Sequence, residues 1–256
     1  MDYSQTLANG VVVVTGASAG LGRALCQDLM GRGVRVAGLA RSNAPLQEMA
    51  KDAPEGLFLP VAVDVGDPLA VTEAFAKIRS EMGAVSVLIN NAALYPRRDL
   101  LEETVDSFMH TVQVNLGGMV ACTAQALADM VETGVGRIVN VTTYAGNRPA
   151  PTAAAYSVSK GACRIYTKAL LADLGDRFPD IIINEWIPGR LNTAMGIPEG
   201  LDPADVARWG GKLALMHDRE ISGMTFAGDR SVQPPAGIKR RIVNRILGRE
   251  RQIHLG

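Results

Sequence analysis

Residues 11–22 read Val11-Val12-Val13-Val14-Thr15-Gly16-Ala17-Ser18-Ala19-Gly20-Leu21-Gly22. Four consecutive β-branched residues are typical of a strand that is buried on both faces, as the strands of a parallel sheet are. The glycines after this strand permit a tight turn, because glycine adopts backbone conformations that other residues avoid. A helical pattern follows at residues 21–32. The stretch therefore predicts a βα unit with a glycine-rich turn.

The alternation of strand and helix continues along the whole chain. The apolar runs predict strands at 11–14, 34–39, 57–63, 85–89, 138–141, 181–187 and 224–227. Helices are predicted between them at 21–32, 46–51, 68–82, 104–133, 154–175 and 203–216. Such alternation implies right-handed crossovers and an α/β fold. We expect one domain, a doubly wound parallel sheet of about seven strands with helices on both faces.

Composition excludes several classes of protein. The chain has 256 residues, of which 47% are hydrophobic, and a net charge of zero, so no overall field recruits nucleic acid. Its three cysteines (Cys26, Cys122 and Cys163) and three histidines lack the spacing of a metal site or a disulfide framework. We expect no metal, a reducing cytoplasmic compartment, no signal peptide and no membrane span.

A tyrosine and a lysine share one face of the predicted helix at 154–175. Residues 155–160 read Ala155-Tyr156-Ser157-Val158-Ser159-Lys160, and positions four apart on a helix are neighbours. A free tyrosine ionises near pH ~10 and is a poor proton shuttle at neutral pH. A fixed ammonium beside the phenol is expected to lower its pKa towards the working range. The pair is therefore a candidate acid–base centre.

These stretches together resemble one protein family. The glycine pattern, Asn91, Asn115, the strand and threonines at 137–143, the Tyr156/Lys160 pair and Pro188-Gly189 fall in the order and spacing of the short-chain dehydrogenase/reductase family. The resemblance covers about residues 8 to 230. It implies a Rossmann-like NAD(P)-dependent oxidoreductase domain at 1–230, followed by a basic extension at 231–256.

The resemblance also implies a cofactor site. Its expected members are Gly16, Ser18, Gly20, Leu21, Gly22, Arg41, Asp64, Val65, Asn91, Ala92, Tyr156, Lys160, Pro188, Gly189 and Thr193. Family members that prefer NAD carry aspartate where this chain has Ala40, whereas Arg41 can donate a forked pair of hydrogen bonds to a phosphate. NADP is therefore favoured over NAD, although many NADP-using relatives have a basic residue in place of Ala19. A further departure is Ala93, where the family has glycine.

The residues that the resemblance assigns to catalysis are Asn115, Thr143, Tyr156 and Lys160. Thr143 stands where the family places a serine, and its hydroxyl can bind a carbonyl oxygen that gains negative charge; Thr142 is the fallback. In relatives, an asparagine at the position of Asn115 holds a water that links the lysine to solvent. The alternative is a helix kink stabilised by the side-chain amide, without a proton relay.

The resulting hypothesis is hydride transfer between NADP(H) and a ketone or secondary alcohol, in the reductive direction, with Tyr156 as general acid or base. A non-catalytic NADP-binding sensor or subunit is an alternative. So is a relative that epimerises or dehydrates its substrate through a keto intermediate. A short segment between Thr193 and the next helix suggests an open pocket for a bulky or carrier-held ketone.

Several residues near this pocket are ambiguous from sequence alone. Leu94, Tyr95, Tyr144, Trp186 and Met195 are candidate pocket walls or ordinary core residues. Arg97 and Arg98 either face solvent or meet an anionic group.

The last part of the chain is basic. Isoleucines recur every four residues from Ile238 to Ile246 among lysine and arginine residues, which predicts a short amphipathic helix. It either packs as an arm on a neighbouring subunit or lies on an anionic membrane. Small residues on the Tyr156/Lys160 helix permit close helix packing, and the family usually forms tetramers. We expect a homo-oligomer, either a dimer or a tetramer.

Overall fold

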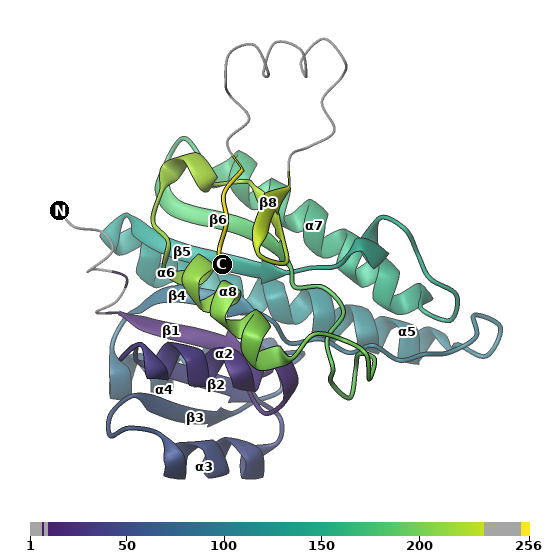
Figure 1. The fold of residues 1–256 in the computed structure, drawn as a ribbon, viewed down its shortest axis with the longest axis horizontal. Helices are drawn as coiled ribbons and strands as arrows, with labels where there is room; N and C mark the ends of the chain where they lie inside the picture. Colours follow the sequence, from purple (N-terminus) through teal and green to yellow (C-terminus); the bar gives the residue numbers. More distant parts are fainter. Residues whose placement is uncertain (1–6, 8–9, 233–251) are drawn as a thin grey trace.

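The computed structural model describes Leu7, residues 10–232 and residues 252–256. These residues form one eight-stranded sheet in the order β3-β2-β1-β4-β5-β6-β7-β8 (Figure 1). The strands are β1 (Val11–Thr15), β2 (Val36–Ala40), β3 (Phe58–Ala62), β4 (Val85–Asn90), β5 (Val135–Val141), β6 (Asp180–Ile187), β7 (Thr225–Ala227) and β8 (Arg230–Val232). All neighbouring strands pair in parallel except β7 and β8.

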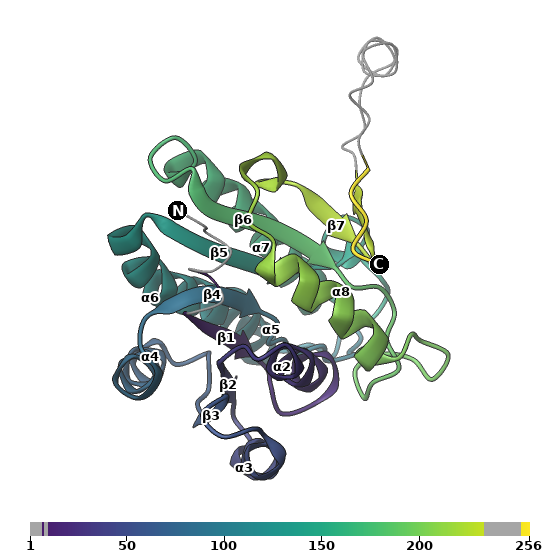
Figure 2. The same cartoon turned by 60° about the vertical axis from the view of Figure 1, so that its left-hand side comes forward.

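Helices cover both faces of the sheet (Figure 2). They are α2 (Gly20–Gly31), α3 (Asn43–Asp52), α4 (Pro68–Met82), α5 (Val105–Val112), α6 (Gly118–Thr133), α7 (Ala154–Leu174) and α8 (Pro203–Leu215). One core cluster joins α2, α3 and α8 to the sheet, and the other joins α4, α6 and α7. Alternate residues of β1 enter opposite clusters, which explains why its four valines are all buried. The doubly wound α/β fold is therefore confirmed.

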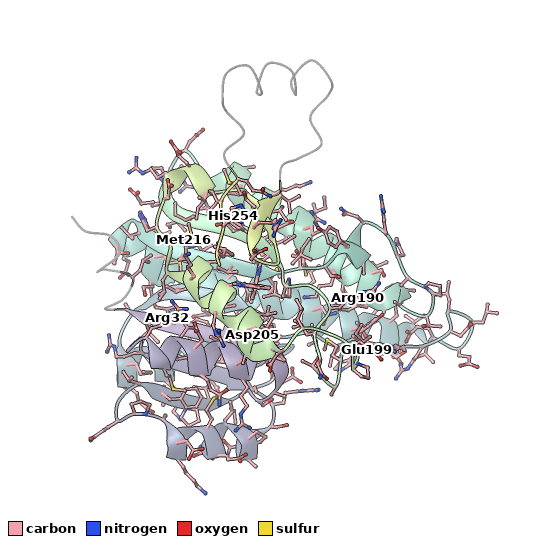
Figure 3. The ribbon with its side chains drawn as sticks, in the orientation of Figure 1. Arg32, Arg190, Glu199, Asp205, Met216 and His254 are labelled. Carbon is pink, nitrogen blue, oxygen red and sulfur yellow. The ribbon has the colours of Figure 1, made fainter. Side chains whose placement is uncertain are left out.

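The structure adds one strand that the sequence pattern did not predict. β8 is a three-residue strand that pairs antiparallel with β7 through a turn at Gly228, whose φ is +58°. The end of the chain returns to this edge: Ser231 N–H donates to the Ile253 carbonyl, and Leu255, with 3% of its surface exposed, is part of the core. Figure 3 shows the neighbouring His254 in this position. The amphipathic helix expected around Ile238 to Ile246 lies outside the described residues.

α5 and α6 are two parts of one continuous helical run. A π-helical segment, η1 (Gln113–Gly117), joins them. The run, Val105–Thr133, is 29 residues long and, by length and composition alone, apolar enough to cross a membrane. The expectation of no membrane span stays a prediction. Half of its most apolar window is buried inside the fold, as in a core helix of a globular protein.

Arg137 is a charged residue inside a central strand. Its side chain is fully buried, and its guanidinium donates to the carbonyl oxygens of Leu213 and Ile182. Leu213 belongs to the last turn of α8, where unpaired carbonyls and the helix dipole favour a cation. Burial lowers the pKa of Arg137 to about 9, so the side chain stays charged at neutral pH. The arginine thereby links α8 to the sheet.

Candidate active site

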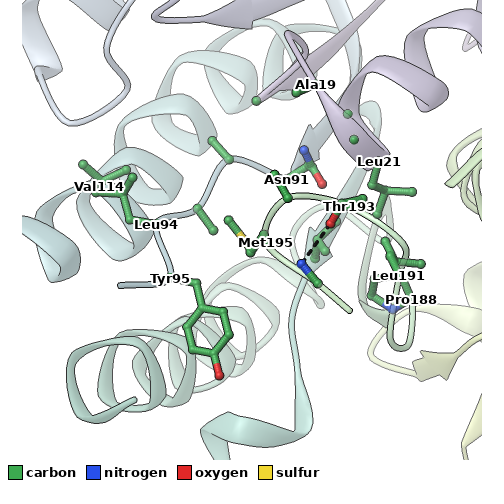
Figure 4. A pocket seen from close by; sticks show the side chains of 18 of the residues that line it. Ala19, Leu21, Asn91, Leu94, Tyr95, Val114, Pro188, Leu191, Thr193 and Met195 are labelled. Carbon is green, nitrogen blue, oxygen red and sulfur yellow. Dashed lines mark hydrogen bonds between the residues drawn. The ribbon is translucent and has the colours of Figure 1, made fainter. Parts of the chain in front are cut away.

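A pocket of about 690 Å³ opens at the carboxyl ends of the parallel strands, where chain connections leave β1 and β4 in opposite directions (Figure 4). Ligands of open α/β sheets bind at such a point. Every residue predicted to bind the cofactor lines this pocket, from Gly16 of the glycine-rich turn to Thr193. Thr143 lines it as well, whereas Asn115 lies behind the wall with 1% of its surface exposed.

The glycine-rich turn brings free backbone amides to the pocket. Gly16 has a φ of +71°, and a Cβ on Gly22 would lie 2.1 Å from the Gly16 carbonyl oxygen. Neither position therefore accepts a side chain without distortion. α2 begins directly after the turn, and its N-cap, Ala19, supplies no side-chain hydrogen bond. The first amides of α2 are thus free to bind an anionic ligand.

Asn91 ties the ends of two central strands together. Its side-chain amide donates to the Thr15 carbonyl at 2.9 Å, and the backbone amides of Asn91 and Ala92 both donate to the Thr15 hydroxyl at 2.9 Å. These bonds fix the end of β4 against the end of β1. The asparagine therefore shapes the floor of the pocket.

The far end of the pocket is polar. Arg41 and Ser42 follow β2, and both side chains are exposed and line the pocket. Ser42 is the N-cap of α3, but its hydroxyl makes no capping bond there. After β3, Asp64 accepts a hydrogen bond from the Gly66 amide at 2.9 Å, which fixes the turn that carries Val65. This end thus combines a guanidinium, an unused hydroxyl and a helix N-terminus.

Tyr156 and Thr143 meet at the other end of the pocket. Both residues line it, and the Thr143 hydroxyl, at the N-cap of the short 3₁₀ helix η2 (Tyr144–Gly146), accepts from the Ala145 amide at 3.3 Å and also opposes the rise in the pKa of the Tyr156 phenol. Thr142, in contrast, is 3% exposed, and its hydroxyl has no hydrogen-bond partner among the described residues. Between the two threonines, Thr143 is the one placed to act with the tyrosine.

Lys160 is buried and directed at the sheet. Its ammonium donates to the Val141 carbonyl of β5 at 2.9 Å, and burial lowers its pKa. The pKa of Tyr156 is raised to about 12, mainly by burial, although the Thr143 hydrogen bond opposes this. The expectation that the ammonium lowers the pKa of the phenol is therefore wrong for the protein chain alone, since burial dominates the shift and Lys160 is not among its causes.

Asn115 acts as a clamp within the π-helical segment. Its side-chain amide donates to the Leu94 carbonyl at 3.0 Å and to the Ser159 hydroxyl at 2.9 Å, and its oxygen accepts from the Leu94 amide at 2.6 Å. The backbone carbonyl of Asn115 accepts from the thiol of Cys163 at 3.3 Å. The kink that the sequence indicated is present, and the side chain stabilises it. A proton relay through this residue stays a prediction.

A glycine pair sets how closely Thr143 approaches Tyr156. Gly146 ends η2, and Gly161 follows Lys160 on α7. A Cβ on Gly146 would lie 2.8 Å from the Gly161 backbone nitrogen. Because only glycine fits this contact, the segment that carries Thr143 packs directly on the backbone of α7.

The substrate side of the pocket differs from expectation at two residues. Leu94, Tyr95 and Met195 line it, as Figure 4 shows. Trp186 does not, because it is fully buried in the core and its indole N–H donates to the Gly228 carbonyl. Tyr144 also lies outside the lining and is 55% exposed.

The loop between β6 and α8 covers part of the pocket. Its two sides are bridged at Leu191 and Leu201, and Figure 3 shows Arg190 and Glu199 on it. The Gly196 amide donates to the Thr193 hydroxyl at 3.1 Å, drawn as a dashed line in Figure 4. Sequence reasoning missed the lining residues Ser42, Val114, Arg190, Leu191, Gly196 and Ile197. For Arg190, its place between Pro188-Gly189 and Thr193 was the available signal.

No group of three or more His, Cys, Asp or Glu side chains that could hold a metal ion occurs in the described part of the chain. The arrangement instead suits an organic ligand with an anionic centre. It combines free amides in the middle, a cationic end at Arg41 and a phenol with a hydroxyl partner at the opposite end. Such a site can bind a phosphorylated cofactor and move one proton.

Comparison with known proteins finds related sequences. The family model described as short chain dehydrogenase matches residues 10–203. L-xylulose reductase of Homo sapiens is 33% identical over 198 residues, which cover 77% of this chain and 78% of that protein. Carbonyl reductase [NADPH] 2 of Sus scrofa is 34% identical over 192 residues, or 75% of each chain. Meso-2,3-butanediol dehydrogenase of Serratia marcescens is 30% identical over 187 residues, or 73% of each chain.

Solved structures show the same fold. The crystal structure of the KRED1-Pglu enzyme superimposes with a TM-score of 0.77 at 25% identity, covering 85% of this chain and 99% of that chain. A short chain dehydrogenase from Bacillus anthracis gives a TM-score of 0.78 at 22% identity, covering 86% of this chain and 95% of that chain.

Proposed function

This chain belongs to the short-chain dehydrogenase/reductase family of oxidoreductases, and from that premise we propose that it reduces a ketone with NADPH, or oxidises the corresponding secondary alcohol. The observation that carries the proposal is that Tyr156, Thr143 and Lys160 line the same pocket as the glycine-rich turn. The family places its acid–base chemistry on residues of this kind.

The residues present fit a dinucleotide. The uncapped amides at the start of α2 suit the pyrophosphate, and Gly22 leaves room for the turn that presents them. Lys160 lies in the same pocket as Tyr156 and can hold a ribose hydroxyl near the phenol. When bound, the nicotinamide supplies or accepts the hydride.

The protein's own part in the reaction is to orient the carbonyl and to move a proton. Tyr156 Oη donates its proton to the substrate oxygen in reduction and removes it in oxidation. The Thr143 hydroxyl stabilises the charge that develops on that oxygen. A protonated phenol suits reduction, because the pKa of about 12 keeps the proton on Tyr156 until the substrate takes it.

The choice of NADP rests on the far end of the pocket. Ala40 carries no carboxylate that would repel a 2′-phosphate, and Arg41 and Ser42 supply a guanidinium and a free hydroxyl at the start of α3. A helix N-terminus also favours an anion. One relative, carbonyl reductase 2, carries NADPH in its name. Arg41 is accordingly the residue to test for cofactor choice.

The proposal is tested by following oxidation of NADPH and NADH with a panel of ketones. Turnover is expected with NADPH, and Tyr156→Phe should lower kcat by about 10²- to 10⁴-fold while the Kd for NADPH changes little. Tight binding of NADPH without turnover of any ketone would instead support a sensor. Conversion of substrate without net consumption of cofactor would support an epimerase or a dehydratase.

We also propose a homo-oligomer that uses α5 and α7. Val105 and Met109 on α5, and Val158 and Ile165 on α7, are each more than half exposed, and the two helices contact each other. Apolar side chains gathered on adjacent helices are typical of a subunit contact. Light scattering should give a dimer or a tetramer, and Ile165→Asp should shift it towards the monomer. An unchanged mass would exclude this face.

A further inference from the structure

The pocket is lined by more cationic than acidic side chains. The cationic lining residues are Arg41, Arg97, Lys160 and Arg190, whereas Asp64 is the single acidic lining residue among those described. Asp64 follows β3, at the same end as Arg41, and it is engaged by the Gly66 amide. The two arginines on the loops after β4 and β6 are therefore left without a counter-charge in the pocket.

Arg97 and Arg98 have different surroundings although they are adjacent. The guanidinium of Arg98 pairs with Glu103 at 3.2 Å, and its backbone amide donates to Thr152 on a neighbouring loop. Arg97 has no carboxylate partner among the described residues, and its guanidinium carbon lies 5.4 Å from the centre of the Tyr95 ring. Both side chains are exposed, but Arg97 lines the pocket and lies over the Tyr95 ring, whereas Arg98 pairs with Glu103 outside the lining.

Tyr95 connects this arginine to the acid–base centre. Its ring lies against that of Tyr156, with centroids 4.3 Å apart and planes inclined by 36°. Placed end to end, the two distances put the Arg97 guanidinium carbon less than about 10 Å from the Tyr156 ring. A substrate whose carbonyl meets the phenol could therefore reach Arg97 with a group only a few bonds away.

Arg190 is another arginine that lines the pocket. It follows Pro188-Gly189 at the start of the loop over the pocket, its side chain is exposed, and none of the described residues forms an ion pair or hydrogen bond with that side chain. Guanidinium groups bind carboxylates and phosphates with two parallel hydrogen bonds. Two of them around an otherwise largely apolar opening favour an oxyanion.

We propose that the substrate is a ketone or secondary alcohol that carries a carboxylate or a phosphate, bound by Arg97 and assisted by Arg190. This inference rests on the proposed oxidoreductase function and narrows its substrate class. The oxyanion orients the substrate, so that the carbonyl carbon is presented between Tyr156 and the cofactor. Binding energy from a group remote from the reacting carbon is thereby used to position it.

The test compares pairs of ketones that differ only in the oxyanion: a keto acid with its methyl ester, and a keto phosphate with the dephosphorylated alcohol. The wild-type enzyme should prefer the anionic member by at least about 10-fold in kcat/KM, as charged hydrogen bonds allow. Arg97→Met should reduce this ratio to near one, and Arg190→Met should reduce it partly. Arg98→Met is the matched control and should leave the ratio as in the wild type.

The ratio of the two members cancels any general loss of activity in a variant. A wild-type enzyme that reduces the neutral member as well as the anionic one, or an Arg97→Met variant with an unchanged ratio, would overturn the proposal. Whether the keto acid or the keto phosphate shows the larger ratio identifies the oxyanion.

A binding measurement separates this proposal from the proposed function. Saturation-transfer NMR should detect the keto acid or keto phosphate on the wild-type protein with NADPH present, and more weakly on Arg97→Met. Retained anion binding without turnover of any ketone would refute the reductase and leave the oxyanion site standing. Turnover of neutral ketones without anion binding would support the reductase and refute the oxyanion site.

Discussion

The side-chain amide of Asn115 and the backbone of Leu94 exchange two hydrogen bonds, of 2.6 and 3.0 Å. A third bond joins Asn115 to the Ser159 hydroxyl on α7. The π-helical segment therefore holds together the chain after β4, which carries Tyr95, and the helix that carries Tyr156. This buried amide therefore helps to position the segments that carry both aromatic rings.

Asn115→Ala should lower the free energy of unfolding by about 2–4 kcal/mol, because buried partners on Leu94 and Ser159 lose their bonds. Urea denaturation measures the change. Gln113→Ala, in the same π-helical segment, is the control: its one exposed bond to Gly66 should cost less than about 1 kcal/mol. Equally small losses of stability in the two variants would show that the Asn115 side chain contributes little to the fold. A shift in the pH dependence of kcat for Asn115→Ala would add support for a proton relay.

Gly146→Ala should impair catalysis more than cofactor binding. The new methyl group would lie 2.8 Å from the Gly161 backbone nitrogen, so η2 must move away from α7 and take Thr143 with it. We expect kcat to fall by about 10-fold or more, while the Kd for NADPH stays within about threefold. Gly31→Ala at the end of α2, where nothing lies within 4 Å of the added Cβ, should leave both values unchanged. Wild-type kcat in Gly146→Ala would contradict this account of the site.

Thr143→Val should lower kcat by about 10- to 10³-fold, since the variant keeps the shape but removes the hydroxyl that lines the pocket with Tyr156. Thr143→Ser restores the hydroxyl, and the family's own residue, and should recover most of the activity. Steady-state kinetics on the best ketone of the panel measures both. If valine and serine gave the same kcat, the hydroxyl would have no part in the reaction.

The half-buried phenol of Tyr156 should destabilise the fold at alkaline pH. Its pKa is about 12 in the folded chain against 10.0 for an unperturbed tyrosine, so between these values the unfolded chain releases a proton that the folded chain keeps. The free energy of unfolding contributed by this group is complete below pH 10 and declines as pH rises towards 12. At pH 11 the loss is about 1.4 kcal/mol.

Urea denaturation of the wild type and Tyr156→Phe at several pH values isolates this contribution. The difference in stability between the two proteins should change by about 1.3 kcal/mol between pH 9 and pH 11, in favour of the variant. If the difference in stability between the two proteins did not change with pH, the phenol would have the same pKa in the folded and the unfolded chain.

The sequence was most informative where a residue type occurs at a position for a single local physical reason. The valines of β1 and the glycines at 16, 20 and 22 predicted a buried strand and a tight turn, and both are present. It was least informative where a side chain depends on distant partners. Nothing local shows that Arg137 caps α8, that Trp186 points into the core or that Arg97 and Arg98 diverge.

Arg41 is the residue expected to decide cofactor preference. It lines the pocket after β2 beside the free hydroxyl of Ser42, and no acidic side chain occupies position 40. Arg41→Ala should raise the KM for NADPH by about 10-fold or more and that for NADH by less than about threefold, because only NADPH carries the 2′-phosphate. Ala40→Asp should reverse the preference by repelling this phosphate and accepting a hydrogen bond from the 2′-hydroxyl of NADH. Arg23→Ala, on α2 and outside the pocket lining, controls for a general loss of positive charge. If NADH served the wild type as well as NADPH does, or if Arg41→Ala weakened both cofactors alike, Arg41 would be an ordinary surface arginine.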